Sequence, residues 1–341
     1  MSEIRQDITT GEWTIIAEDR SLRPFQNALK GKSNNESSKD CPFCPGSEKN
    51  TPKEIYALRS KGSSNSPGWQ VRVVPNKFPA LTDDITLIVD GSKLGHDLYP
   101  HQQGFGYHEV IIETPDHTKH MALLNPIEIE HVLKTIHTRY HHLQQDPRVR
   151  FIFPFRNHGI KAGASIAHPH CQILATPVIP MHSLHRFELA FDYFKKTKES
   201  LFSKILKNEQ KIFKRVVLES SHFIVFCPYA SRAPFEIWIL PKKIKPHFGC
   251  LSIGEMKDLA VVLRQSLMRL NKALKNPDYN LAMISAPHLH KMTDDQKAAF
   301  SWHIKIYPRL SSFAGFEIGT GMTINTVSPE NATKILKDIS I

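Results

Sequence analysis

The sequence predicts an α+β protein made of two similar halves, each an antiparallel sheet with helices packed on it. Two observations support this prediction. Short strand-like segments rich in β-branched and aromatic residues alternate with longer segments of helical periodicity. The same order of elements then recurs in the second half of the chain, which indicates an internal duplication. We expect the halves to span residues 1–180 and 181–341.

In the first half, strand patterns surround one long helical pattern, Pro126–Leu143. The predicted strands are Trp69–Val74, Glu109–Glu113, Arg150–Phe155 and Cys171–Ala175. Two further stretches, 30–40 and 60–68, are poor in apolar residues and rich in Ser, Asn, Gly and Lys. This composition predicts mobile loops, and the first of them leads directly into Cys41.

The second half opens with a long charged helix, predicted from about Met181 to Lys214. A second helix is predicted at Ser252–Leu274, among strands at Phe223–Phe226, Phe235–Leu240, Tyr279–Ile284 and Trp302–Tyr307. The last strands of the two halves superpose as His168-Pro-His170-Cys-Gln172-Ile on Ser301-Trp-His303-Ile-Lys305-Ile. Duplicated chains commonly keep their chemistry in one copy, and the first copy has the richer set of polar residues.

Composition excludes several classes of function. The 341-residue chain has 44 Lys and Arg against 33 Asp and Glu, but this excess is dispersed and no nucleic-acid-binding motif accompanies it. We therefore expect no nucleic acid partner, whereas a site for phosphorylated small molecules suits basic residues equally well. No apolar run reaches membrane-spanning length, and the start is charged, so we expect a cytoplasmic protein without membrane contact. Five cysteines are too few for a secreted disulfide framework.

The segment around His170 is the first candidate for chemistry. His168, His170 and Gln172 occupy alternate positions of a predicted strand, so their side chains share one face. Three polar side chains are a poor core, although an edge strand with two surface histidines is an open alternative. The preceding run, 157–165, supplies glycines, an amide and a hydroxyl where backbone could approach an anion closely.

Cys41 and Cys44 have the C-x-x-C spacing that lets two thiolates face one zinc ion. A redox pair is the alternative, but the thioredoxin-type strand and helix are missing. The other two ligands must then be histidines, and with 19 histidines the sequence does not choose among them.

Together these segments resemble the galactose-1-phosphate uridylyltransferase family, within the histidine-triad superfamily. The resemblance extends from Arg5 nearly to the C-terminus, so two histidine-triad-like halves are the fold it implies. The matching segments are Arg5-Gln-Asp-Ile-Thr-Thr-Gly-Glu-Trp, Arg20-Ser-Leu-Arg23-Pro-Phe, Cys41-Pro-Phe-Cys44-Pro-Gly, Val74-Pro-Asn76-Lys-Phe-Pro-Ala-Leu, Glu113-Thr-Pro-Asp-His117 and Gly163-Ala-Ser165-Ile-Ala-His168-Pro-His170-Cys-Gln172.

The resemblance implies a role for each matching residue. One zinc ion per chain would be bound by Cys41, Cys44, His117 and His168. His170 would be the nucleophile, and Gln172 and Ser165 would bind the transferred phosphoryl group. The residues expected around the nucleotide and its phosphates are Arg20, Arg23, Asn76 and Asn157. The family also implies a homodimer.

The residue types agree with group transfer through a covalent intermediate. Imidazole is nucleophilic and neutral near pH 7, and it is a good leaving group from phosphorus. Histidine-triad hydrolases place a histidine where this chain has Gln172, which can donate a hydrogen bond but cannot protonate a leaving group. The glutamine therefore favours transfer to a second phosphate over hydrolysis.

Two segments depart from the usual family pattern. Many members have a second metal site in the C-terminal half, but the corresponding positions here are Ile284, His303 and Lys305, so we expect no second metal. His303 is then a buried or hydrogen-bonded remnant. The segment 315–325 resembles a branch of the superfamily that phosphorolyses ADP-glucose.

The leading interpretation is a ping-pong enzyme that moves a nucleoside monophosphate from a nucleotide sugar through His170 to a sugar phosphate or to phosphate. We expect uridylyl exchange between UDP-glucose and galactose 1-phosphate, as in galactose metabolism. ADP-glucose phosphorolysis is the alternative, and a nucleotide-binding protein without catalysis is a third hypothesis.

Overall fold

The computed structural model describes residues 3–6, 13–16, 40–84, 95–96, 98–289, 292–312 and 314–341. Arg20, Arg23 and most of the expected loop 30–40 lie outside the described residues. The second expected loop, 60–68, connects strands β3 (Tyr56–Arg59) and β4 (Trp69–Pro75). None of the helices in the described part of the chain is long and apolar enough to cross a membrane.

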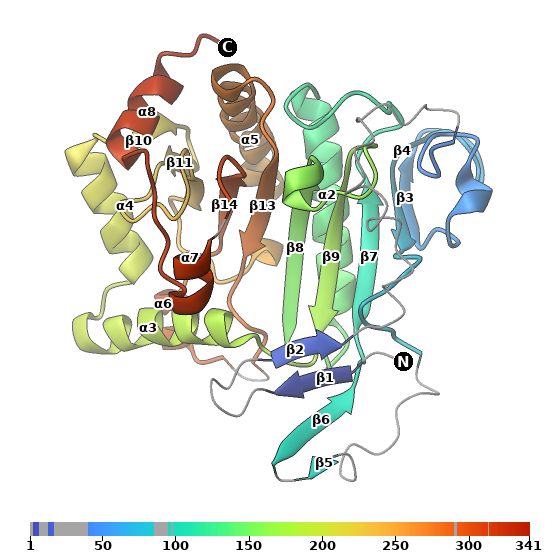
Figure 1. The fold of residues 1–341 in the computed structure, drawn as a ribbon, viewed down its shortest axis with the longest axis horizontal. Coiled ribbons are helices and arrows are strands. Elements are labelled where there is room, and N and C mark those ends of the chain that lie inside the picture. The colour runs from blue at the N-terminus through green and yellow to red at the C-terminus, as the bar shows by residue number, and fades with distance from the viewer. Residues whose placement is uncertain are drawn as a thin grey trace.

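A ten-stranded antiparallel sheet runs through the molecule (Figure 1). Its order is β10-β11-β12-β14-β13-β8-β9-β7-β4-β3. The strands from the first half are β3 (Tyr56–Arg59), β4 (Trp69–Pro75), β7 (Tyr107–Ile112), β8 (Phe151–His158) and β9 (His170–Thr176). Those from the second half are β10 (Val216–Glu219), β11 (Phe223–Phe226), β12 (Ile237–Pro241), β13 (Tyr279–Ile284) and β14 (His303–Pro308).

The prediction of a separate sheet in each half was wrong. Strands β8 and β13 pair from Phe155↔Ala282 to His158↔Tyr279, and this pairing joins the two half-sheets into one. The physical reason is that each half-sheet would otherwise expose an unpaired edge strand, whose backbone N–H and C=O groups each find partners in the other half. Because every residue has these groups, the side-chain pattern does not reveal the pairing.

The two halves nevertheless have the same strand order, β3-β4-β7-β9-β8 in the first and β10-β11-β12-β14-β13 in the second. A long helix follows the third strand in each half: α2 (Pro126–Gln144) follows β7, and α5 (Ile253–Leu274) follows β12. The α+β class is confirmed, and this repeat agrees with the predicted duplication.

Helices α2 and α5 cover one face of the sheet and bury its main core. Both begin at a capping box, Asn125 with Glu128 and Ser252 with Glu255, which satisfies backbone N–H groups at the first turn. Alternate strand residues such as Ile173 and Ile304 point into this core, whereas His170, Gln172 and Lys305 point to the opposite face. We call this opposite face the site face.

The predicted helix from Met181 to Lys214 is in fact two helices, α3 (Met181–Thr197) and α4 (Leu201–Ile212). The chain turns at Lys198, which adopts a left-handed conformation with φ of 56° and donates its N–H to the carbonyl of Phe194. No proline or glycine marks this break. Apolar side chains of α3 and α4 form a separate core with Phe300 and part of the second half-sheet.

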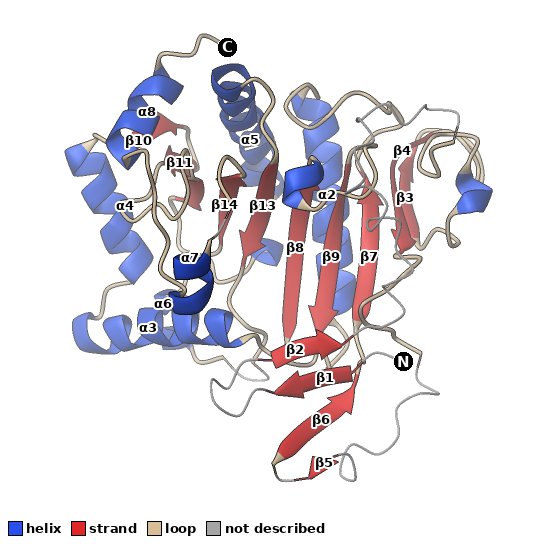
Figure 2. Cartoon of the chain, viewed as in Figure 1, coloured by secondary structure: helices blue, strands red, loops and turns tan. Residues whose placement is uncertain are grey.

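The remaining elements are short (Figure 2). A small sheet of order β2-β1-β6-β5 lies beside the main one. Its strands are β1 (Glu3–Gln6), β2 (Trp13–Ile16), β5 (Gly95–His96) and β6 (Tyr99–Gln103). The short helices are η2 (Glu48–Asn50), η5 (Ile160–Ala162), η6 (Phe248–Cys250), α6 (Asp294–Ala299), α7 (Gly315–Thr320) and α8 (Pro329–Lys337).

Candidate active site and metal centre

Three separate segments bring the expected zinc ligands together. Cys41 and Cys44 lie in the turns before η2, His117 follows β7, and His168 precedes β9. Their ligand atoms all lie within 4.8 Å of one another. Among the described residues this is the one group of its kind.

The spacing of these atoms suits zinc. The Sγ atom of Cys44 lies 3.4 Å from Nδ1 of His117 and 3.5 Å from Nδ1 of His168, and Cys41 Sγ lies 3.7 Å from the same His168 nitrogen. A tetrahedral zinc ion with ordinary Zn–S and Zn–N bonds separates S and N ligands by about 3.6 Å. The residues therefore fit the metal that the sequence predicts.

Hydrogen bonding prepares His168 as a ligand. Its Nε2–H donates to the carbonyl of Thr114 at 2.8 Å, which places the lone pair on Nδ1, the atom that faces the sulfurs. Burial, as the main cause, lowers the pKa of His168 to about 4, so the ring is neutral at pH 7. Burial also raises the pKa of Cys41 to about 12, so a metal must displace a thiol proton when it binds.

We expect one zinc ion per chain, and Cys44→Ser should lower the zinc content and the unfolding temperature together. The metal connects the turn at Cys41 to the segments at His117 and His168, so losing a thiolate ligand loosens all three. The measurement is elemental analysis with thermal unfolding on protein never exposed to chelator. Cys250→Ser, at an exposed cysteine, is the control. Equal zinc contents in the two variants would contradict the assignment.

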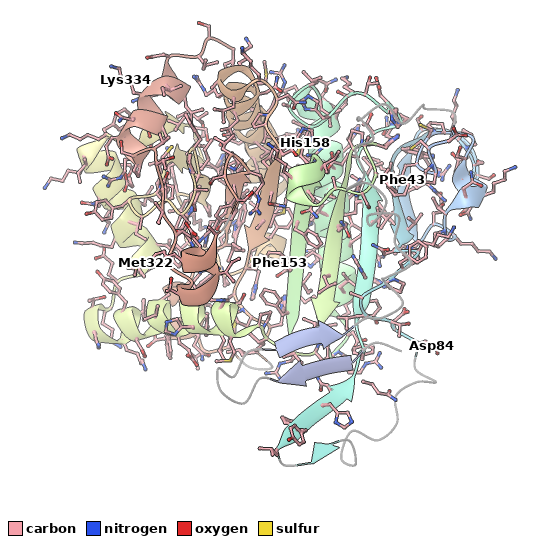
Figure 3. The ribbon with its side chains drawn as sticks, viewed as in Figure 1. Phe43, Asp84, Phe153, His158, Met322 and Lys334 are labelled. Atoms are coloured by element: carbon pink, nitrogen blue, oxygen red, sulfur yellow. The ribbon has the colours of Figure 1, made fainter. Side chains whose placement is uncertain are left out.

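A backbone carbonyl next to the four expected zinc ligands determines the tautomer of His170. Its Nδ1–H donates to the carbonyl of His168 at 2.9 Å, so the lone pair lies on Nε2. The side chain is buried, and the ring of Phe43 packs edge-on against it at 5.4 Å between centroids. Phe43 comes from the turn between the two cysteines (Figure 3). The segments that carry the expected zinc ligands therefore also hold the candidate nucleophile in place.

Hydrogen-bond donors on two neighbouring side chains determine which end of the Gln172 amide is the oxygen. Ala80 N–H donates to Nδ1 of His108 at 3.1 Å, so the His108 proton lies on Nε2, which donates to Gln172 Oε1 at 2.8 Å. Phe78 N–H similarly donates to Oδ1 of Asn76, which turns the Asn76 amide nitrogen towards the same Gln172 oxygen at 3.4 Å. The Gln172 NH₂ group must therefore face away from His108.

The loop between β8 and β9 is anchored by the second half of the chain. The Asp278 carboxylate accepts the N–H of Lys161, and a Cβ atom at Gly159 would lie 2.0 Å from this carboxylate, so only glycine fits. The Asn280 amide donates to Oδ1 of Asn157 at 2.9 Å and to the carbonyl of Ala162 at 2.8 Å. The pairing of β8 with β13 therefore brings Asp278 and Asn280 to the loop between β8 and β9, where they hold its conformation.

Most of the expected site residues meet in this region. Phe155 pairs with Gln172, so Asn157, two residues further along β8, lies next to His170 on the site face. Figure 3 labels Phe153 and His158 along the same strand. Ser165 is half-buried in the loop before His168. Arg20 and Arg23 lie outside the described residues.

Sequence reasoning missed two residues, His108 and Phe43. His108 alternates with Val110 and Ile112 along β7, so a histidine on the site face was the available signal. Phe43 lies inside the C-x-x-C motif, and no pattern distinguishes its contact with His170 from ordinary packing.

Comparisons with known proteins show what this chain is similar to. Residues 1–180 match the family described as galactose-1-phosphate uridyl transferase, N-terminal domain, and residues 114–340 match a domain of unknown function, DUF4921. ADP-glucose phosphorylase of Arabidopsis thaliana is 34% identical over 340 residues, which cover 99% of this chain and 93% of that protein. Galactose-1-phosphate uridylyltransferase of Thermotoga maritima is 26% identical over 348 residues, covering 100% and 99%.

Solved structures show the same fold. The crystal structure of an ADP-glucose phosphorylase from Arabidopsis thaliana with bound ADP-glucose has a TM-score of 0.78 and 32% identity, with 100% of both chains covered. A uridylyltransferase structure has a TM-score of 0.78 at 24% identity, covering 98% of this chain and 97% of that one.

Proposed function

Because this chain belongs to the galactose-1-phosphate uridylyltransferase family of the histidine-triad superfamily, we propose that it is a nucleotidylyltransferase that phosphorolyses ADP-glucose, with His170 as the nucleophile. The observation that carries the choice of substrate is the 34% identity, over 99% of the chain, to an ADP-glucose phosphorylase. The uridylyltransferase relative is more distant, at 26% identity. This reverses the preference of the sequence analysis, where uridylyl exchange came first.

In the first half-reaction, Nε2 of His170 attacks the α-phosphorus of ADP-glucose. The Nε2–P bond forms, the bond from that phosphorus to the bridging oxygen breaks, and glucose 1-phosphate leaves with the electron pair. A phosphate leaving group needs no proton, so the absence of an acid at Gln172 is no obstacle. The carbonyl of His168 accepts the Nδ1–H and so stabilises the positive charge that develops on the ring.

In the second half-reaction, an oxygen of inorganic phosphate attacks the same phosphorus, the Nε2–P bond breaks, and ADP leaves. The Gln172 NH₂ group, directed away from His108, supplies a hydrogen bond to a phosphoryl oxygen in both steps. Zinc at Cys41, Cys44, His117 and His168 would act structurally by fixing the segment that carries His168.

The test is to incubate the protein separately with ADP-glucose and UDP-glucose, and to identify the covalent nucleotide by mass. We expect AMP on His170 after ADP-glucose, and its release as ADP when phosphate is added. UMP from UDP-glucose as the dominant adduct, with release to galactose 1-phosphate, would instead favour uridylyl exchange. No adduct from either substrate would favour a nucleotide-binding protein without catalysis.

A further inference from the structure

The second half of the sheet contains a buried lysine on the site face. Lys305 is only 6% exposed, and its ammonium lies 4.0 Å from the centre of the Trp238 ring. Within the described parts of the chain, that ring contact is its one direct partner. An ammonium group has three donors, and with no acceptor among the described residues these donors remain available to a ligand with acceptor atoms.

The charges around Lys305 point to an anion. Arg186 on α3 and Arg232 both contribute positive charge at Lys305, against the single carboxylate of Glu236. That carboxylate already accepts from the N–H of Arg232 and from Nε1 of Trp238 at 2.7 Å. Burial and then Arg186 lower the pKa of Lys305 to about 7, which agrees with an uncompensated positive site.

Space for a ligand adjoins Arg232, one of these three side chains. A cavity of about 390 Å³ is lined by Arg232, Tyr307 and Arg309, among others. Tyr307 follows Lys305 by two residues on the same face of β14, and both Tyr307 and Arg232 lie close enough to Arg186 to affect its ionisation. Glu317, the acidic residue of this cavity, accepts a hydrogen bond from the N–H of Ala314 at the start of α7.

The same place in the first half contains the proposed phosphoryl site. His303 Nδ1–H donates to the carbonyl of Ser301 at 3.1 Å, as His170 does to His168. Two residues later, Lys305 stands on β14 where Gln172 stands on β9. The second half therefore has the ammonium of Lys305 at the position where the first half has the Gln172 amide, which is proposed to bind a phosphoryl oxygen.

We propose that Lys305, Arg186 and Arg232 form a second anion-binding site, which takes a phosphate group carried by inorganic phosphate or by a sugar phosphate. The phosphate oxygens would accept from Lys305 and the two guanidinium groups, which supplies the acceptors that Lys305 lacks. This site is separate from His170 and does not depend on the activity proposed above.

The test is equilibrium dialysis of the full-length protein with radiolabelled inorganic phosphate and, in a second arm, radiolabelled glucose 1-phosphate. Lys305→Met and Arg186→Met remove a charge at similar length, and Lys257→Met makes the same change at an exposed lysine of α5. We expect each site variant to weaken one class of binding at least about tenfold, as losing one charge-assisted contact does, while Lys257→Met binds as the wild type. The arm with the tighter wild-type binding identifies the source of the phosphate group.

Thermal unfolding separates ligand binding from a purely structural role of Lys305. In phosphate-free buffer, Lys305→Met should unfold at or above the wild-type temperature because it removes a buried charge that no carboxylate contacts directly. It should also lose the stabilisation that the ligand gives the wild type. Identical binding isotherms for Lys305→Met and Lys257→Met in both arms would overturn the proposal. A lower unfolding temperature without any change in binding would also overturn it. Labelling of His170 by ADP-glucose reports separately on the proposed activity.

Discussion

His170→Ala will abolish nucleotidyl transfer, with a loss on the order of 10⁴-fold or more, because the proposed intermediate cannot form without Nε2. The fold and the metal should survive, since His170 lies outside the group of four ligand atoms and its Nδ1 donates to a backbone carbonyl, that of His168. That bond is worth about 1 kcal/mol, so the variant should unfold only slightly below the wild type. The measurements are turnover, covalent adduct by mass, and zinc content.

The matched control for this variant is His142→Ala, which removes an exposed histidine from α2. It should transfer nucleotides at the wild-type rate and form the adduct normally. Near-normal turnover in His170→Ala would show that the covalent mechanism is wrong. A loss of zinc together with activity would instead show that His170 supports the metal centre.

Gln172→His will lower transfer by at least about a hundredfold, the scale seen when one oriented transition-state donor is lost. In the native site, Gln172 Oε1 accepts from His108 and Asn76, and this leaves the NH₂ group to face the phosphoryl oxygens. An imidazole at position 172 cannot reproduce both functions, because its donor and acceptor nitrogens are fixed in one ring and do not occupy the positions of the amide NH₂ and Oε1. It could also protonate leaving groups or activate water, so slow release of free nucleoside monophosphate is the side reaction to measure.

His108→Leu is the companion variant. It removes the donor that orients the Gln172 amide without removing the amide, so kcat should fall by less than in Gln172→His while KM for ADP-glucose changes little. Unchanged transfer in Gln172→His would mean that Gln172 does not face the phosphorus. Equal losses of kcat in the two variants would mean that orientation of the amide accounts for its whole effect.

Local patterns in the sequence were sufficient to predict most of the strands and both long crossover helices. Strands β11 and β13 have the predicted bounds, and α2 and α5 differ from them by one residue. These predictions succeed because side-chain periodicity follows directly from strand and helix geometry. The failure at Lys198 has the same cause, since apolar periodicity continues across the break and the left-handed turn leaves no mark in composition.

For the candidate site too, part of the information comes from the sequence and part only from the tertiary structure. The sequence by itself singled out Cys41, Cys44, His168, His170 and Gln172 as candidate site residues, because spacing and family resemblance are properties of the order of residues. Only the tertiary structure decided which atoms of these residues are usable: Nδ1 of His168, Nε2 of His170 and the NH₂ of Gln172. It also joined the half-sheets through β8 and β13 and left Lys305 buried among positive charges. The physical reason is that tautomers, amide orientations and buried charges depend on partners that strand register brings from distant segments.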